Sequence, residues 1–89
     1  MKNKFEHEIH LALGNLISKY QAEHGESVAQ FAKGSGISVS TVQRLEHGAG
    51  NPSLFMACRI AAHMGVTLED LSSACLDSIQ SAGKGQERP

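Results

Sequence analysis

Residues 25–54 read GESVAQFAKGSGISVSTVQRLEHGAGNPSL and contain two short helical patterns that flank a glycine-rich turn. Ser27 stands where the hydroxyl of a helix N-cap would accept from the first backbone amides. The apolar residues that follow it at helical spacing are Val28, Phe31 and Ala32. Gly36 then favours a sharp reversal, because glycine takes a positive φ without a steric penalty. We therefore predict a short helix over residues 28–33 and a tight turn after it.

The second pattern begins at Ser38, another expected N-cap, and continues to about His47. Val42 and Leu45 have the spacing of its buried positions, and Ala32 is small where the two helices should cross. Two helices joined in this way form a helix-turn-helix, whose second helix offers side chains from its first turns to a DNA major groove. The sequence therefore predicts a helix-turn-helix at the second and third helices of the chain.

Two longer helices are expected on either side of this motif. The first runs from about Phe5 to Glu23 and stops at Gly25. Its apolar positions are Phe5, Ile9, Leu13, Leu16, Ile17 and Tyr20. Asn51 is the expected cap of a fourth helix, with Pro52 in its first turn, and that helix should end at Gly65. Its core-facing residues should be Leu54, Ala57, Cys58, Ile60, Ala61 and Met64.

A fifth helix should begin after its N-cap Thr67, with Glu69 and Asp70 in the first turn, where the helix dipole favours acidic residues. Its apolar positions are Leu68, Leu71, Ala74, Cys75 and Ile79. The following stretch, SAGKGQERP, has nothing to bury. We therefore predict one all-α domain of five helices over residues 1–80 and a disordered tail over residues 81–89.

Length and composition fit one small globular domain, since the chain has 89 residues and a hydrophobic fraction of 40%. A domain of this size buries only roughly 60 to 65% of its unfolded surface, so oligomerisation would help its stability. No stretch approaches the ~20 apolar residues of a membrane span, and the N-terminus MKNKFEHEIH lacks the apolar run of a signal peptide. We expect a soluble, cytoplasmic protein without membrane contact.

The cysteines and histidines do not form a recognisable catalytic or metal site. Cys58 and Cys75 are interpreted as reduced core residues, the alternatives being a disulfide or a zinc pair with His63. The five-residue step from Cys58 to His63 places them poorly on one helix face, and no second pair completes a tetrahedral set. No spacing supplies the orienting partner and pocket that a catalytic base needs. We expect no enzyme, no catalytic residue, no metal and no cofactor.

The net charge of −1 is low for a nucleic-acid-binding protein, because phosphate neutralisation supplies most non-specific affinity. The charges are unevenly distributed. Residues 18–60 carry four basic side chains against three acidic ones, whereas residues 61–89 carry two against four. Most of the acidic excess therefore lies away from the helix-turn-helix, although the local field there stays weak.

Several short motifs match a known family in both residue type and order. They are Leu13-Gly14, Phe31-Ala32, Gly36-Ile37-Ser38, Val42 with Leu45-Glu46 and Gly48, Asn51-Pro52-Ser53-Leu54, Ile60-Ala61, and Gly65-Val66-Thr67-Leu68 with Leu71. Together they resemble the lambda-repressor-like domain of the Cro/C1 or XRE family of transcriptional regulators, over roughly residues 13–71. The resemblance implies a compact five-helix DNA-binding domain that acts on double-stranded DNA.

By this resemblance the third helix would enter the major groove. The positions that match the family's base-reading residues are Val39, Ser40, Thr41, Gln43 and Arg44. Gln43 can pair bidentately with adenine and Arg44 with guanine, while Val39 or the Thr41 methyl can pack on a thymine methyl. Alternatively, Gln43 and Arg44 are solvated side chains, because the buried spacing of this helix turns both outward whatever they bind.

Phosphate contacts in the family come from the start of the second helix, the cap of the third and the loop after it. The corresponding residues here are Ser27, Val28, Ser38, Ser40, His47 and Asn51. Their hydroxyls, side-chain amide and helix N-terminal amides can donate to phosphate. Lys33 can also reach the DNA backbone, or it is simply solvated.

The chain departs from the family pattern at three places. Val28 replaces a glutamine that often touches DNA, and Gln21 replaces an arginine that commonly pairs with the family glutamate, here Glu46. A neutral hydrogen bond between Gln21 and Glu46 is one expectation, and a more exposed Glu46 is the other. The loop HGAGNPS also lacks the usual lysine or arginine. These changes predict low non-specific affinity and a shallow salt dependence, or loss of DNA binding.

The leading functional hypothesis is a sequence-specific transcriptional regulator, a repressor, that binds an inverted repeat as a homodimer. Its dimer surface would contain Phe55, Met56, Leu76 and Ile79. The presence of these apolar residues is explained equally well if they are additional residues of the core. The alternative hypothesis is a protein-interaction module on the same fold, such as an antitoxin or a regulator that binds a partner protein through this surface.

Overall fold

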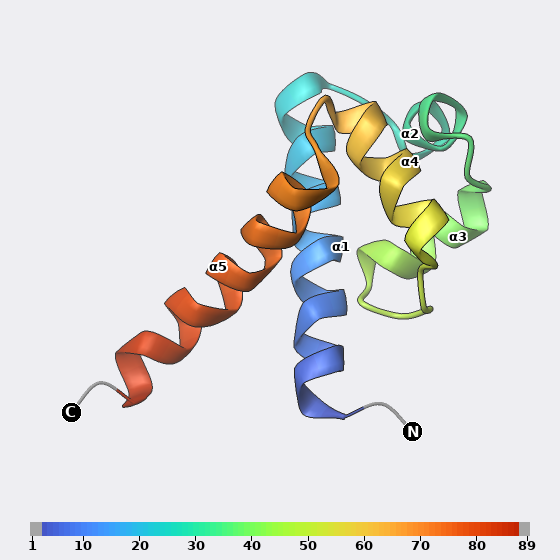
Figure 1. Cartoon of the computed structure of the whole chain (residues 1–89). Coiled ribbons are helices and arrows are strands. Elements are labelled where there is room, and N and C mark those ends of the chain that lie inside the picture. The colour runs from blue at the N-terminus through green and yellow to red at the C-terminus, as the bar shows by residue number, and fades with distance from the viewer. Residues whose placement is uncertain (1–2, 88–89) are drawn as a thin grey trace.

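In the computed structural model, which describes the backbone of residues 3–87 and the side chains of residues 3–80, five helices form an all-α fold (Figure 1). They are α1 (Lys4–His24), α2 (Val28–Ser35), α3 (Val39–Glu46), α4 (Leu54–Met64) and α5 (Leu68–Glu87). The short helices α2, α3 and α4 gather beside α1, while α5 crosses α1 and diverges from it toward the C-terminus (Figure 1). The predicted five-helix fold with α2 and α3 as the helix-turn-helix is confirmed.

Serine side chains form the N-caps of three of these helices. Ser27 accepts from the Gln30 amide, and the Gln30 side chain accepts from the Ser27 amide, so each residue satisfies an otherwise unpaired donor. Ser38 caps α3, and Ser53 caps α4 by accepting from the Met56 amide at 3.1 Å. The caps at Ser27 and Ser38 are those that the sequence predicts.

The predicted start of the fourth helix is wrong by two residues. Asn51 and Pro52 both precede α4, and the extended residue Ser53 takes the capping position that the sequence assigned to Asn51. Leu54 is therefore the first residue of α4, and its side chain is 71% exposed. Cys58 is also exposed, because it lies outside the stripe that faces the core. The core-facing assignments of Leu54 and Cys58 are corrected accordingly.

The centre of the core receives one fully buried residue from each of the first four helices: Ile17, Phe31, Val42 and Ile60. The fifth helix adds Leu71 and Cys75. Burial raises the pKa of the Cys75 thiol above its ordinary value, which favours the neutral form. This core fixes the relative positions of the helices around α3.

Gly14 lets α1 lie directly against the end of α3. A Cβ at this position would collide with the carbonyl oxygen of Leu45 and would lie 2.9 Å from that of Glu46. Glycine is therefore required here for close approach rather than for an unusual φ. The backbone of α1 supports the inner side of α3 and holds its other side toward solvent.

The last helix begins as the sequence predicts. The hydroxyl of Thr67 accepts from the Asp70 amide at 2.9 Å, and the Asp70 carboxylate accepts from the Thr67 amide at 3.4 Å. The helix continues through Glu87, beyond residue 81 where the sequence places the start of a tail. The division into a domain over residues 1–80 and a disordered tail over 81–89 stays a prediction. Among residues 3–87, none of the helices has the length and apolar character of a membrane span.

Candidate nucleic-acid interface

We call the exposed side of α3 the recognition face; it is formed by Val39, Ser40, Thr41, Gln43 and Arg44. On the opposite side of this helix, Val42 is 0% and Leu45 is 3% exposed. The helical repeat therefore turns Ser40, Gln43 and Arg44 toward solvent. The remaining two predicted base-reading residues are Val39, which is exposed, and Thr41, which is half-buried at the edge of the face. The structure brings all five onto one short helix, and their contacts with bases stay predictions.

Hydroxyl groups at the start of α3 already bond to one another. The Ser38 hydroxyl donates to Thr41 Oγ1 at 2.8 Å and accepts from the Thr41 amide at 3.2 Å. Ser40 Oγ lies 3.4 Å from Ser38 Oγ. This arrangement fixes the Thr41 side chain, so its methyl group has a defined direction relative to the recognition face. The Ser38 hydroxyl would have to exchange a partner before it donated to a phosphate.

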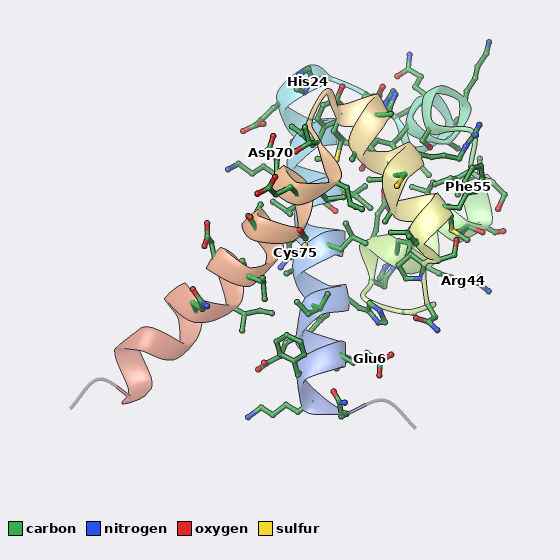
Figure 2. The ribbon with its side chains drawn as sticks, in the orientation of Figure 1. Glu6, His24, Arg44, Phe55, Asp70 and Cys75 are labelled. Carbon is green, nitrogen blue, oxygen red and sulfur yellow. The ribbon has the colours of Figure 1, made fainter. Side chains whose placement is uncertain are left out.

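The end of α3 and the loop that follows form one edge of the recognition face. His47 Nδ1 donates to the Gln43 carbonyl oxygen at 2.8 Å, which holds the exposed imidazole at the helix end. Gly50 has a φ of +81°, and a Cβ there would lie 3.9 Å from Arg44 Nε. Arg44 lies beside this loop on the side of the molecule away from the C-terminal end of α5 (Figure 2). The exposed Asn51 follows in the same loop.

The start of α2 contributes backbone amides more than side chains. The amide groups of a first helical turn have no partner within the helix and can bind an anion. Ser27 is exposed, whereas Val28 packs against the core, so Val28 can serve a phosphate only through its amide. Lys33 is exposed farther along α2. These positions agree with a phosphate-binding role, which stays a prediction for each.

Support behind α3 differs from the expected pairing of Gln21 with Glu46. Gln21 Nε2 and Glu46 Oε2 are both buried without a hydrogen-bond partner among the described residues. The predicted neutral hydrogen bond between them is therefore absent, and Glu46 is half-buried rather than exposed. The position of α3 depends instead on apolar packing and on its close approach to Gly14.

Arg59 of α4 is a residue near the site that the sequence did not single out for a role. Its Nε donates to the carbonyl oxygen of Ser35, the last residue of α2, at 2.9 Å. Its guanidinium carbon lies 5.2 Å from the centre of the Phe55 ring. The step of four residues between Phe55 and Arg59 was the available sequence signal, because such pairs meet on a helix surface.

A second unpredicted contact joins α4 to the segment before α2. His63 Nε2 lies 2.9 Å from a carboxylate oxygen of Glu26, and both side chains are 16% exposed. The imidazole packs edge-to-face on Phe31 with 4.8 Å between ring centres. The Tyr20 hydroxyl donates to the His63 carbonyl oxygen at 3.3 Å. His63 is thus engaged in packing and in a hydrogen bond with Glu26. No group of three His, Cys, Asp or Glu side chains in the described part of the chain could hold a metal ion.

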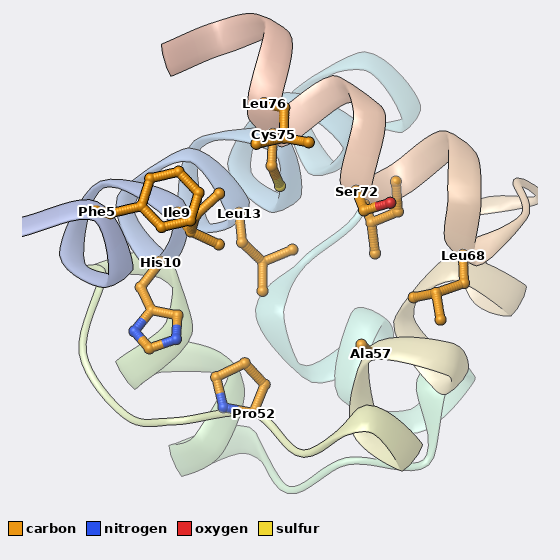
Figure 3. A pocket seen from close by; sticks show the side chains of 11 residues that line it. Phe5, Ile9, His10, Leu13, Pro52, Ala57, Leu68, Ser72, Cys75 and Leu76 are labelled. Carbon is orange, nitrogen blue, oxygen red and sulfur yellow. The ribbon is translucent and has the colours of Figure 1, made fainter. Parts of the chain in front are cut away.

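The four residues assigned to a dimer surface do not form one patch. Phe55 is 66% exposed but lies against Arg59, and Met56 and Ile79 pack partly against the core. Leu76 is 38% exposed and lines an apolar groove of about 430 Å³ between α1, α5 and the start of α4 (Figure 3). We call this the α1–α5 groove; its lining also includes Phe5, Ile9, Leu13, Pro52, Leu68 and Cys75. Only Leu76 of the predicted set belongs to it.

A family model described as helix-turn-helix matches residues 21–71, which contain α2, α3 and α4. The chain belongs to this helix-turn-helix family, and the Cro/C1-type or XRE resemblance found in the sequence is confirmed. An uncharacterized HTH-type transcriptional regulator of Methanocaldococcus jannaschii is 37% identical over 57 residues, which cover 64% of this chain and 86% of that relative. No solved structure matches the chain.

Proposed function

We propose that this protein is a sequence-specific DNA-binding transcriptional regulator that reads an inverted-repeat operator as a homodimer. The observation that carries this proposal is the recognition face, where exposed Gln43 and Arg44 stand opposite the fully buried Val42. The family of the chain and the name of its relative in Methanocaldococcus jannaschii, a transcriptional regulator, support the same function.

In the proposed complex α3 lies in the major groove. Arg44 donates two hydrogen bonds to the acceptor edge of guanine, and Gln43 pairs with adenine. Val39 or the Thr41 methyl packs on a thymine methyl, while Ser40 borders the same groove. Each bidentate pair gives about 1 to 3 kcal/mol of discrimination against the wrong base. Arg44 and Gln43 are therefore the proposed main determinants of specificity.

Phosphate contacts in this proposal position the domain rather than select the sequence. The amides at the start of α2, beside Ser27 and Val28, face one phosphate. Ser38, His47 and Asn51 approach others from the two ends of α3, and Lys33 contributes charge. Because the chain has a net charge of −1, we expect weak non-specific binding and a shallow dependence on salt.

A homodimer fits both the function and the α1–α5 groove. One domain of this size reads few base pairs, whereas two copies related by a two-fold axis double the contacts on a palindromic site. Phe5 is 57% and Leu76 is 38% exposed at this groove, so a second copy would remove apolar surface from water. The proposed dimer therefore forms through α5 near Leu76.

Repression is the proposed outcome, because a dimer that occupies an operator excludes other proteins from the same DNA. A DNA-binding role also implies a cytoplasmic location in a cell without a nucleus. No catalytic step is part of this proposal.

Selection of bound sequences from a random pool of double-stranded DNA tests the proposal. We expect enrichment of an inverted repeat whose half-site centres are about one helical turn, or ~34 Å, apart. Absence of enrichment and of any mobility shift at ~50 mM salt would remove the DNA-binding proposal.

The second candidate function is a protein-interaction module, such as an antitoxin or a regulator that binds a partner protein. The apolar α1–α5 groove and the low net charge favour it. A chain that fails to select DNA but remains folded and monomeric, with the groove open, would move this candidate to first place.

A further inference from the structure

The turn between α2 and α3 is built around the side chain of Arg59. Arg59 Nε donates to the carbonyl oxygen of Ser35 at 2.9 Å, in a part-buried hydrogen bond that joins residues 24 positions apart. Carbonyl groups at a helix C-terminus lack partners within the helix and carry partial negative charge. A guanidinium donor at Ser35 therefore satisfies and stabilises the end of α2 where the chain turns toward α3.

Gly36 leaves the space that the guanidinium occupies. Gly36 has a φ of +76°, and its amide donates to the Ala32 carbonyl oxygen at 2.9 Å. A Cβ on Gly36 would collide with Arg59 Nη2 and lie 2.8 Å from Cζ. Glycine is needed at this position for its backbone conformation, and its missing Cβ also leaves room for the Arg59 guanidinium.

Phe55 covers the same guanidinium from outside. Its ring centre lies 5.2 Å from Arg59 Cζ, one turn earlier on α4. A cation over an aromatic face is attracted to the ring, and the contact limits the conformations of a long side chain. This contact accounts for a phenylalanine that is 66% exposed on α4 without requiring a dimer partner there.

The next residue along the turn, Ile37, is only 9% exposed and anchors the chain in the core just before Ser38 caps α3. The turn is thus held by Ile37 from inside and by Arg59 from α4. Any change in the turn would rotate the recognition face, since α3 has only eight residues and starts two residues later.

We propose that Arg59 is a positioning residue for DNA recognition: it fixes the α2–α3 turn through Ser35 and Gly36, with Phe55 holding the guanidinium in place, and so sets the direction of the recognition face. This inference rests on the proposed DNA-binding function. In this role Arg59 differs from a phosphate contact, because it acts through the hydrogen bond from its Nε to the Ser35 carbonyl oxygen and not through DNA.

The test compares Arg59→Met and Arg59→Lys with the unaltered chain in operator binding, using the sequence selected from the random pool and a mixed-sequence duplex. Arg59→Met keeps an apolar stem but loses the donor, and we expect about tenfold or greater loss of operator affinity, equal to loss of one aligned base contact per half-site. Affinity for mixed-sequence DNA and the slope of log affinity against log salt should stay unchanged. Arg59→Lys, which can still donate to Ser35, should recover part of the operator affinity.

Lys33→Met is the comparison for loss of a phosphate contact: it removes one positive charge from α2 without touching the turn, and it should weaken binding to the operator and to mixed-sequence DNA alike. If Arg59→Met instead weakens all DNA equally and lowers the salt slope by about 0.9 per lost contact, Arg59 binds phosphate and the proposal is wrong. Unchanged operator affinity with a lower melting temperature would also overturn it, since Arg59 would then serve stability alone. Circular dichroism at the assay temperature establishes that each variant is folded.

Amide hydrogen exchange without DNA separates this inference from the proposed function. We expect faster exchange at Gly36 and Ile37 in Arg59→Met, with smaller changes in the same direction in Phe55→Leu and none in Lys33→Met. If the unaltered chain does not bind DNA, the proposed function is wrong and Arg59 has no role in DNA recognition. The hydrogen-exchange rates still test whether Arg59 holds the turn. Unchanged exchange at Gly36 and Ile37 would show that Arg59 does not hold the turn.

Discussion

Apolar side chains are more fully buried within one copy on the helix-turn-helix side of the molecule than on the side that contains the α1–α5 groove. Around α2 and α3, Phe31 and Val42 are 0% exposed, and the serine caps and Arg59 satisfy the helix ends. Beside the groove, Phe5 is 57% and Leu76 is 38% exposed. A rigid surface that presents hydrogen-bonding groups must be complete within one copy, whereas an apolar groove can be completed by another molecule.

The largest expected difference between the two sides is in stability. Phe31→Ala should lower the free energy of unfolding by about 3 to 5 kcal/mol, because it leaves a cavity at the centre of the core. Phe5→Ala should cost about 1 kcal/mol at most, since 57% of that side chain is already in water. Urea denaturation measures both. Equal losses would mean that the groove side is as fully packed as the core.

Arg44→Ala should affect recognition without affecting the groove side. We expect loss of preference at one base in each half-site, about 1 to 3 kcal/mol, because one bidentate contact is removed. Lys33→Ala should instead weaken binding to all sequences alike. Competition binding with single-base variants of the operator measures the difference. Equal loss on every sequence for Arg44→Ala would contradict its assignment as a base-reading residue.

Leu76→Glu, unlike Arg44→Ala, should affect the assembly of the dimer rather than the recognition of bases. A carboxylate at the groove should raise the dimer dissociation constant at least about tenfold, or about 1.4 kcal/mol, because it would be buried unpaired in the interface. Light scattering over a concentration series measures the molar mass, and Ser78→Glu, on an exposed position of α5, is the control. A monomeric unaltered chain that still selects an inverted repeat would contradict the proposed dimer surface.

The smallest expected effect concerns the hydrogen bond between Glu26 and His63. Glu26→Gln should lower the free energy of unfolding by about 1 kcal/mol, since it weakens one partly exposed hydrogen bond between α4 and the segment before α2. Glu23→Gln makes the same charge change at an exposed position of α1 and should have almost no effect. Thermal unfolding of the two variants gives the comparison. An equal shift in both would assign the effect to net charge rather than to the contact.

Local features of the sequence were sufficient for most of the helix-turn-helix side. Helical spacing identified Val42 and Leu45 as buried, and the caps at Ser27 and Ser38 follow from side chains that bond within four residues. The start of α4 was misplaced because Asn51, Pro52 and Ser53 are all residues that favour helix starts. The choice among them depends on how the loop after α3 packs, which is not a local property.

Contacts between distant segments could not be predicted from spacing. Arg59 meets Ser35 across 24 residues, and His63 meets Glu26 across 37. Neither pair forms a periodic pattern, because each depends on how α4 crosses the other helices. The separation of Phe55 from Leu76 has the same cause. The sequence identifies both as apolar residues outside the expected core, but only the tertiary fold places Phe55 on Arg59 and Leu76 beside the groove.

A chemical-shift titration of the isotope-labelled chain with the selected operator tests most directly whether α3 is the surface that binds DNA. We expect the largest shifts at residues 39–44 and at the loop amides after α3, with small changes along the α1–α5 groove in a chain that is already dimeric. Largest shifts at Phe5 and Leu76, with residues 39–44 unchanged at saturating DNA, would contradict this expectation.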